Sequence, residues 1–464
     1  MPENTLAASR LGLDDARRRR SITWVVALST LALVFDGYDL VVYGTVVPTL
    51  LADPNQLGRL SPSQAGALGS YALVGVLIGA LTAGAVGDWI GRRRVMLVGL
   101  AWFSIGMGAT ALTTSVQTFG FFRLLTGIGV GALVATVGAL VAEFAPAGRR
   151  NVLNAVVYSG VPAGGVLAAV VALVMPDAAG WRPLFWIGAA PIVLLLPVAL
   201  VRLPESPKWL VARGRFEQAQ AQSRRTGIPL PTLSAPLPTT LSTTAPAGAR
   251  HVGFGALARS PLAWPTLLLG TMSFGGLLLT YGLNTWLPKI MQDNGFGKSY
   301  SMTFLLVLNL GAIVGGLLAS RVADRVGAKS VVASTFVLAA LTLALLPFRL
   351  PAAALLLAVA VAGVGTIGTQ VLIYGLVSNY YPTRARAAGV AWCAGFGRLG
   401  GIVGPVIGGA LVGAGVGGTT AFYVFAVVSL LGALVTWLLP QSRHEEAAAA
   451  ATVPAAEAAS TVAV

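Results

Sequence analysis

The stretch ITWVVALSTLALVFDGYDLVVYGTVVPTLL occupies residues 22–51, and two carboxylates interrupt an otherwise apolar run. A membrane-spanning helix needs about 20 consecutive apolar residues, so this stretch is long enough to cross a bilayer. Asp36 and Asp39 lie near its middle, where each acid costs roughly 2.5–3.5 kcal/mol on insertion scales. Charges at that depth usually face the interior of a helix bundle. The stretch therefore predicts a membrane helix that carries a functional pair of acids.

The composition extends this prediction to the whole chain. Of the 464 residues, 56% are hydrophobic and 10% are charged, whereas soluble domains carry about 25% charged residues. A chain inside lipid must satisfy its backbone hydrogen bonds internally, so each apolar segment is predicted to be a helix. Twelve such segments occur, at residues 22–51, 63–86, 94–114, 118–143, 152–175, 183–202, 262–290, 300–322, 329–347, 351–379, 388–413 and 419–439. We predict an all-α polytopic membrane protein with 12 transmembrane helices.

Basic residues are distributed unevenly between the two sides that twelve spans define. The formal net charge is +15, and 24 of the 31 lysines and arginines fall on the side that carries both termini. The positive-inside rule places that side in the cytoplasm. The positive charge is therefore explained by membrane topology, and it does not indicate a nucleic-acid partner.

Residue types that catalysis and metal binding require are scarce in this chain. Cys393 is the only cysteine, and the two histidines, His251 and His444, lie in a predicted loop and tail. The sequence contains no pattern typical of a nucleophile–base pair, a phosphate-binding loop or a zinc site. We predict no enzyme activity, no metal and no cofactor.

The chain contains two halves that repeat with an offset of 236 residues, so that Asp88 maps to Asp324 and Gly91 to Gly327. Six-helix halves related in this way are typical of secondary transporters, whose substrate site lies between the halves near the membrane midplane. We predict two pseudo-symmetric six-helix bundles. The predicted parts are a cytoplasmic tail (1–20), the first bundle (21–202), a cytoplasmic linker (203–261), the second bundle (262–440) and a disordered cytoplasmic tail (441–464).

Asp36, Asp39 and Tyr43 share one helix face because they are spaced three and four residues apart. A carboxylate in a low-dielectric site beside a like charge can bind and release a proton near neutral pH. This predicts that Asp36 or Asp39 couples transport to protons. The alternative is that the acids only bond neighbouring backbone or cap a helix break at Gly37.

The loop between the second and third spans reads GAVGDWIGRRR over residues 84–94. It resembles the signature Gly-x-x-x-Asp-x-x-Gly-Arg-Arg of the major facilitator superfamily. The resemblance implies the two-bundle major facilitator fold and a gating role for this loop. The alternative is that the charges of the loop only set the membrane topology. The residues assigned to this gating function, including those of the second half, are Gly84, Asp88, Gly91, Arg92, Asp324, Arg325 and Arg386.

Charges near this loop have expected partners. Asp88 is expected to accept backbone N–H groups at the start of a neighbouring helix, where the helix dipole favours negative charge. The arginines beside Asp88 are expected to pair with an acid from another span, such as Glu143. The segment PESPKWL at residues 204–210 resembles an element of several facilitator families, and we interpret it as a cytoplasmic structural element.

Two glycine-rich motifs lie within spans. RLLTGIGVG at residues 123–131 is similar to the Arg-x-x-x-Gly-x-Gly pattern of proton-coupled facilitators. Its Arg123 either tunes a nearby carboxylate or pairs with an anion, or it is a structural arginine near the outer end of the helix. GGIVGPVIGG at residues 400–409 matches a drug-antiporter motif that belongs in the fifth span. Because this copy is in the eleventh span, we interpret it as a helix-packing motif.

The first-span motif DGYD (residues 36–39), NTWLP (284–288) and GRLGGIVGP (397–405) together resemble the aromatic acid:proton symporter family of the same superfamily. The resemblance covers about residues 20–440 and implies uptake of benzoate-type acids into bacteria. The chain departs from the family at Ala328, where some relatives have a histidine. No role for that histidine is transferred to this chain.

Arg398 fits carboxylate recognition on independent grounds. It is the eleventh residue of its span, about 15 Å from the helix end at 1.5 Å per residue, and so lies near the midplane. An arginine fork can hold a carboxylate through two hydrogen bonds. Arg398 is predicted to bind substrate, and the alternative is an ion pair with Asp36 or Asp39. The other residues predicted to bind substrate are Tyr43, Tyr281, Asn284 and Trp286.

The resemblance and the buried charges predict a proton-coupled importer of a small aromatic carboxylate, of the benzoate or hydroxybenzoate class. It is expected to work by alternating access as a monomer in the bacterial inner membrane, in support of aromatic catabolism. Its expected partners are the acid, protons and the lipid bilayer. The alternatives are a symporter for another small organic acid, such as a dicarboxylate or a shikimate-like acid, and a proton-driven drug antiporter.

Overall fold

Helices dominate the part of the chain that the computed structural model describes, which is residues 2–146, 149–176, 179–230, 254–257, 262–348, 350–381, 383–415 and 417–440. Twelve helices in these ranges are long and apolar enough to cross a membrane. The predicted all-α class with 12 spans is confirmed. The predicted disordered tail and much of the predicted linker, at residues 231–253 and 258–261, lie outside the described residues.

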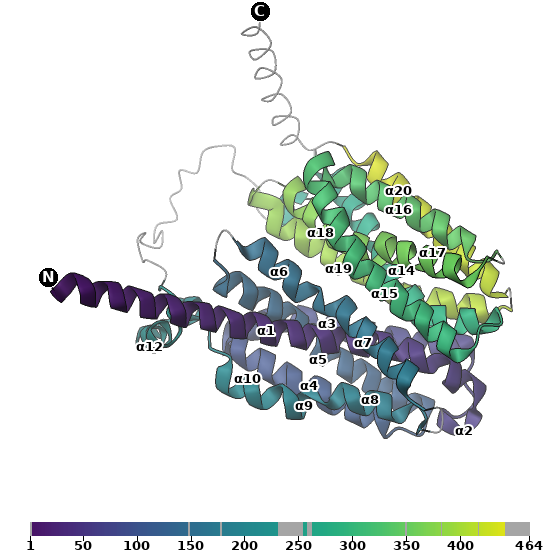
Figure 1. Cartoon of the computed structure of the whole chain (residues 1–464), viewed down its shortest axis with the longest axis horizontal. Coiled ribbons are helices and arrows are strands. Elements are labelled where there is room, and N and C mark those ends of the chain that lie inside the picture. The colour runs from purple at the N-terminus through teal and green to yellow at the C-terminus, as the bar shows by residue number, and fades with distance from the viewer. Residues whose placement is uncertain are drawn as a thin grey trace, which may run out of the picture. The chain divides into compact units, whose positions relative to one another are not determined.

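Apart from the stretch between residues 226 and 254, the helices follow one another along the chain with few intervening residues (Figure 1). Up to residue 226 they are α1 (Pro2–Ala52), α2 (Pro54–Leu57), α3 (Pro62–Ile90), α4 (Arg92–Ala111), α5 (Val116–Phe144), α6 (Arg150–Tyr158), α7 (Gly160–Val174), α8 (Arg182–Ala189), α9 (Pro191–Leu194), α10 (Leu196–Arg202), α11 (Pro207–Ala212) and α12 (Phe216–Thr226), of which α11 and α12 fall within the predicted linker. Those that follow are α13 (Phe254–Leu257), α14 (Ala263–Asp293), α15 (Lys298–Val326), α16 (Ala328–Leu345), α17 (Ala352–Gly363), the π-helical turn η3 (Val364–Gly368), α18 (Thr369–Tyr380), α19 (Thr383–Gly413) and α20 (Gly417–Leu438).

Several boundaries differ from the predicted ones. The first span and the residues before it form one helix, α1, which continues through Gly37 and Pro48. The fifth span is interrupted between α6 and α7, and the sixth is divided into α8, α9 and α10. Pro191 and Pro197 stand in the first turns of α9 and α10, where a missing N–H is tolerated.

The chain divides into two compact units. Unit 1 contains residues 1–242, 281–313 and 402–421, and unit 2 contains residues 243–280, 314–401 and 422–464. Parts of α14, α15 and α19 therefore belong to unit 1 although they follow the linker in sequence. The division of the chain into two six-helix bundles, one on each side of the linker, stays a prediction.

In unit 1, α3 and α5 pack backbone against backbone through interlocking glycines of both helices. A Cβ at Gly75 would lie 2.1 Å from the carbonyl oxygen of Leu124, and one at Gly79 would lie 2.0 Å from that of Ile128. In return, a Cβ at Gly127 would lie 2.0 Å from the carbonyl oxygen of Ala72. Small residues spaced by four are the usual device for such close approach in membranes.

The contact between α1 and α7 is built in the same way. A Cβ at Gly37 would lie 1.9 Å from the carbonyl oxygen of Val161, and one at Gly164 would lie 1.9 Å from that of Val34. Gly37 therefore allows close packing inside a continuous helix, and it does not cap a break in the helix. This packing fixes the part of α1 that carries Asp36 and Asp39.

The later segments of unit 1 use small residues where they meet the first helices. A Cβ at Gly44 of α1 would lie 2.0 Å from the carbonyl oxygen of Asn284, and one at Gly66 of α3 would lie 2.5 Å from that of Pro405. Gly408 lies against the ring of Trp286, whose Nε1 donates to the carbonyl of Pro405 at 2.8 Å. These contacts agree with the interpretation of the 400–409 motif as helix packing.

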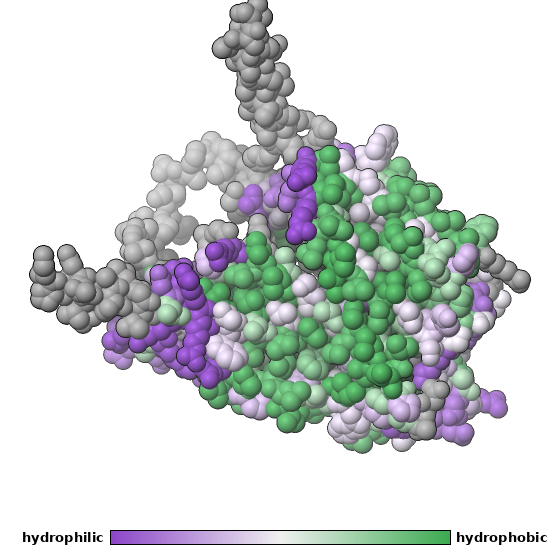
Figure 2. Space-filling model, in the orientation of Figure 1, coloured by the Kyte–Doolittle hydropathy of each residue, from purple (hydrophilic) through white to green (hydrophobic). Residues whose placement is uncertain are grey.

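Unit 2 has a related interior. A Cβ at Gly365 would lie 2.3 Å from the carbonyl oxygen of Thr335, and one at Gly400 would lie 2.0 Å from that of Phe274. The hydroxyl of Thr369 lies 2.8 Å from that of Thr335. Figure 2 shows hydrophobic residues in green over much of the visible surface and hydrophilic residues in purple in separate patches, as a bilayer environment requires.

We expect Gly75→Ala to lower the stability of the protein in detergent by about 1–3 kcal/mol, because the new methyl group overlaps a carbonyl oxygen and forces the helices apart. The matched control is Gly84→Ala on the same helix, where a Cβ meets no atom within 4 Å. The control should leave stability unchanged or raise it slightly. Thermal unfolding of both variants measures the difference, and equal melting temperatures would contradict the packing argument.

Candidate functional site

The two first-span acids are both buried in unit 1. Asp39 has no exposed surface and Asp36 is 4% exposed. Tyr38 and Tyr43 on the same helix are also buried. The expected face of α1 therefore points into the protein, where a charge needs a partner to be tolerated.

Asp39 forms an ion pair with Arg123 of α5. The Nη1 of Arg123 donates a hydrogen bond to Oδ1 of Asp39, and the arginine is 1% exposed. The sequence left open whether Arg123 tunes a carboxylate or is merely structural, and the structure places it against a carboxylate. Breaking such a buried pair by removing one partner costs about 3–5 kcal/mol, because the other charge is left uncompensated.

Aromatic rings surround the guanidinium of this pair. The Cζ of Arg123 lies 5.3 Å from the ring centroid of Tyr43 and 5.9 Å from that of Phe185. Phe119 packs against both rings, at centroid distances of 6.0 Å and 5.7 Å. Each ring face attracts the cation, and together the rings exclude water from the charges.

The hydroxyl groups near the pair are already engaged by backbone. Tyr43 donates to the carbonyl oxygen of Ala65 on α3 at 2.5 Å, and Tyr38 donates to that of Leu184 on α8 at 2.7 Å. The side chains around Asp39 therefore connect α1, α3, α5 and α8. This arrangement gives Tyr43 a structural contact, while its predicted contact with substrate stays a prediction.

The hydrogen-bonding capacity of the pair is only partly used. Among the residues that the structure describes, Oδ2 of Asp39 and Nε of Arg123 have no hydrogen-bond partner. A fully satisfied network would hold both charges firmly, whereas a partly satisfied one is held less tightly in a low-dielectric site. A proton added to Asp39 would remove the charge that keeps Arg123 in place.

The predicted substrate-binding residues of α14 lie in unit 1. Asn284 is buried and accepts a hydrogen bond at 2.9 Å from Nδ2 of Asn309 on α15. Trp286 has no exposed surface, and its N–H is engaged by Pro405. Tyr281 is half-buried. The contacts of Trp286 favour a packing role, and the substrate role of all three residues stays a prediction.

Arg398 belongs to α19 within unit 2, and it is half-buried. The preceding Gly397 lies close to α14, since a Cβ there would lie 2.3 Å from Oγ of Ser273. Trp392 and Phe396 stack on the same helix with ring centroids 5.1 Å apart. The structure thus places aromatic rings on the helix that carries Arg398, and its substrate role stays a prediction.

The predicted gating loop is a tight turn between α3 and α4. Gly91 has a φ of +102°, a conformation that favours glycine. Arg92 pairs with Asp88 at 2.6 Å and with Glu143 of α5 at 3.4 Å. The expected pairing with Glu143 is present. The side chain of Asp88 is 70% exposed, so its bond with Arg92 contributes little to stability.

Glu205, and not Asp88, accepts the N–H group expected at the start of α4. Its Oε1 accepts the backbone N–H of Arg93 and that of Ser206, each at 3.1 Å. Burial raises the pKa of Glu205, and these backbone donors partly oppose the rise. The carbonyl of Asp88 receives the indole N–H of Trp209 at 2.8 Å. The PESPKWL segment therefore fastens α11 to the turn.

The corresponding turn of the second half has the same backbone. Gly327, which is 236 residues after Gly91, has a φ of +92°. Asp324, Arg325 and Arg386 are all exposed. The repeat therefore extends to backbone conformation, and the gating role of these charges stays a prediction.

Sequence analysis did not identify Phe119, Phe185, Glu205 or Asn309 as contributors to these clusters. Phe119 and Phe185 look like ordinary apolar residues of their spans, and only the position of Arg123 shows that they cover a charge. Glu205 carried a usable signal, since it is an acid in a motif beside many basic residues. Asn309 carried another, as an amide within an apolar span.

A double-variant cycle tests the buried pair. Asp39→Asn and Arg123→Gln should each destabilise the protein by about 3–5 kcal/mol, since each leaves one buried charge uncompensated. The combined variant removes both charges and should recover most of that loss. Unfolding in detergent measures all three variants. Additive losses would show that the two side chains do not interact.

Glu205→Gln should retain the hydrogen bonds from the N–H groups of Arg93 and Ser206, because these two go to one oxygen that an amide can supply. The raised pKa means that the folded protein holds the Glu205 proton more tightly than the unfolded chain. The charged form therefore lowers stability progressively as pH rises from the ordinary pKa of 4.5 through the raised value. The glutamine variant should therefore become more stable relative to the parent as the pH rises through that range.

The control is Glu205→Ala, which loses the acceptor and should be destabilised by about 1–3 kcal/mol at every pH. Melting temperatures measured from pH 4.5 to pH 8 would separate the two effects. A constant difference between Glu205→Gln and the parent would contradict the burial of this carboxyl.

Comparison with protein families gives one match across most of the chain. The family described as "Sugar (and other) transporter" matches residues 24–446. Among curated proteins, the chain is similar to the benzoate transport protein of Acinetobacter baylyi, with 30% identity over 437 residues covering 93% of this chain and 92% of the relative. It is 33% identical to the gentisate transporter of Corynebacterium glutamicum, with coverage of 94% and 93%.

Solved structures show the same fold. A D-xylose–proton symporter has a TM-score of 0.70 at 20% identity, covering 91% of this chain and 98% of that chain. An inward-open structure of the xylose transporter XylE from E. coli also has a TM-score of 0.70 at 20% identity, with 91% and 97% covered. The matches to family, relatives and fold agree over nearly the same residues. This chain therefore belongs to the sugar (and other) transporter family of the major facilitator superfamily.

Proposed function

We propose that this chain imports a small aromatic carboxylate, of the benzoate or hydroxybenzoate class, together with protons by alternating access. The observation that carries the proton coupling is the buried pair of Asp39 and Arg123 inside a membrane span. The substrate class is supported by the names of the relatives, which transport benzoate and gentisate. Their similarity extends over more than nine tenths of the chain.

The proposed cycle begins with Asp36 and Asp39 exposed to the outer side of the membrane. Protonation of Asp39 cancels its charge, which releases Arg123 from its ion pair and makes binding of an anion favourable. Arg398 then holds the substrate carboxylate, because a guanidinium fork matches two carboxylate oxygens. Proton and anion must each raise the affinity of the other for the transport of the two to be coupled.

The proposed location is the bacterial cytoplasmic membrane, with both termini in the cytoplasm and the chain acting as a monomer. The twelve spans and the bacterial relatives support a multi-pass membrane protein. The orientation is supported by the 24 basic residues of 31 that fall on the side of the termini. In this orientation the turn at Gly91 and the segment that carries Glu205 lie on the cytoplasmic side.

The test is uptake of radiolabelled benzoate and hydroxybenzoates into proteoliposomes under an inward proton gradient, with and without a protonophore. The parent protein should accumulate substrate, and the protonophore should abolish the accumulation. Asp36→Asn and the combined Asp39→Asn, Arg123→Gln variant should lose accumulation but retain exchange of labelled for unlabelled substrate. Such a split is expected because exchange needs the carboxylate site and alternating access but no net proton movement.

Two further variants complete the design. Asp53→Asn, an acid outside the spans whose carboxylate caps α2, should leave both accumulation and exchange intact. Arg398→Ala should lose both, because the substrate carboxylate has no partner. No uptake of any benzoate by folded parent protein would reject the substrate class, and protonophore-insensitive accumulation would reject the coupling.

A further inference from the structure

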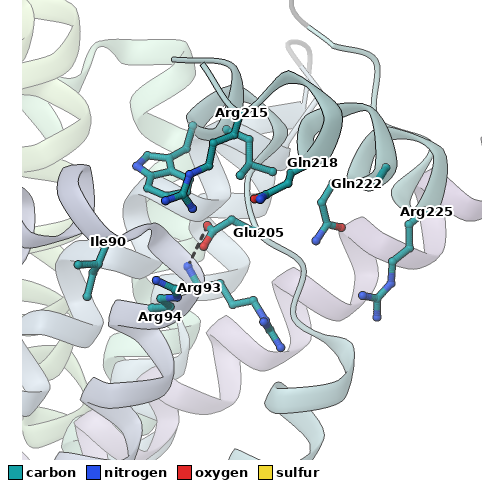
Figure 3. Close-up of a pocket in the computed structure, with 11 residues that line it drawn as sticks. Ile90, Arg93, Arg94, Glu205, Arg215, Gln218, Gln222 and Arg225 are labelled. Atoms are coloured by element: carbon teal, nitrogen blue, oxygen red, sulfur yellow. Dashed lines mark hydrogen bonds between the residues drawn. The ribbon is translucent and has the colours of Figure 1, made fainter. Parts of the chain in front are cut away.

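A cavity of about 390 Å³ lies where α11 and α12 pack beside the turn between α3 and α4. We call it the arginine pocket. Its charged lining consists of Arg93, Arg94, Arg215, Arg225 and Glu205. Figure 3 shows Glu205 between the chain at Arg93 and the side chain of Arg215, which directly precedes α12, with Arg225 further along in that helix. Four positive groups thus share this cavity with one negative group.

The single carboxylate does not neutralise the arginines. Glu205 directs its Oε1 towards the backbone N–H groups of Arg93 and Ser206. Within the described residues, no acid lies within ion-pair distance of any pocket arginine. Burial also disfavours the charged form of Glu205. The cavity therefore carries a positive charge that nothing else in the described chain balances.

The pocket arginines also retain hydrogen-bond donors. Arg93 donates from Nη2 to the carbonyl of Leu200 at 2.6 Å, yet its buried Nε has no acceptor among the described residues. Arg225 donates from Nη2 to the carbonyl of Val201 at 3.1 Å. Arg215 lies over the ring of Trp209, 5.6 Å from its centroid. Several guanidinium N–H groups are thus left for a ligand that accepts many hydrogen bonds.

The position of the pocket indicates what that ligand is attached to. Leu200 and Val201, whose carbonyls the pocket arginines bind, stand near the end of the sixth span. Their side chains are 51% and 63% exposed, as expected for residues that face lipid. An exposed apolar surface near the end of a membrane span therefore begins directly beside a cluster of guanidinium groups.

We propose that the arginine pocket binds the phosphate of an anionic phospholipid headgroup, with the acyl chains lying along α10 beside Leu200 and Val201. Arginine forks match phosphate oxygens in geometry and charge. Basic pockets beside membrane helices are suited to acidic headgroups. Free inorganic phosphate has the same chemistry, but it would not use the apolar surface of α10.

The experiment uses the full-length protein, delipidated in detergent, and measures bound lipid by native mass spectrometry during titration with dioleoyl phosphatidylglycerol. Arg215→Gln combined with Arg225→Gln should weaken binding about thirty-fold. Each basic group near a lipid surface contributes about 1 kcal/mol, and the loss of two such contributions corresponds to about that factor in affinity. Both residues are exposed, so folding should be unaffected. Parallel titrations with dioleoyl phosphatidylcholine and with inorganic phosphate identify the source of the phosphate.

The matched control is Arg224→Gln combined with Arg321→Gln, which removes the same charge from exposed positions that do not line the pocket. The control should bind phosphatidylglycerol as the parent does. Equal weakening in both double variants, or no weakening in the pocket variant, would overturn the proposal by showing non-specific attraction. Displacement of the lipid by millimolar phosphate would support a phosphate site but reject the contribution of α10.

Discussion

The burial of a full positive and a full negative charge inside a membrane bundle constrains the rest of this structure. Asp39 and Arg123 have almost no exposed surface, and each charge alone would cost several kcal/mol in that environment. Their mutual attraction is retained only while α1 and α5 keep their register. Glycine contacts fix α1 against α7 and α5 against α3, and the rings of Tyr43, Phe119 and Phe185 cover the pair.

A buried ion pair of this kind suits a transporter because a single proton on the carboxylate changes the interaction energy of the pair. The ion pair stabilises the packing of α1, α3, α5 and α8 while Asp39 is charged. Neutralising Asp39 turns the same arginine into an uncompensated cation, which favours an arrangement that offers it an anion. The half-used hydrogen bonding of the pair is consistent with this, since a fully bonded network would resist the change.

Much of the fold was predictable because lipid imposes simple rules on sequence. Span number follows from apolar length, and the turns at Gly91 and Gly327 follow from the repeat. The partner of Asp39 was not predictable, because Arg123 and Arg398 both lie within spans. Which of them faces Asp39 depends on the rotation of each helix about its own axis, which the sequence does not reveal. Glu205 was missed because Asp88 stands in the motif, yet Asp88 points to solvent. Trp286 was assigned to substrate by residue type, whereas its N–H bonds Pro405.

The glycine contacts between α3 and α5 have a mechanical consequence. Where two backbones touch with no side chain between them, neither helix can slide or roll without a carbonyl striking a Cα. The two helices are therefore expected to move together as one rigid body. Arg123 stands one turn before Gly127 on α5, and the turn at Gly91 ends α3. This glycine-packed pair of helices therefore connects the buried arginine to the turn at Gly91, beside which Glu205 bonds the start of α4.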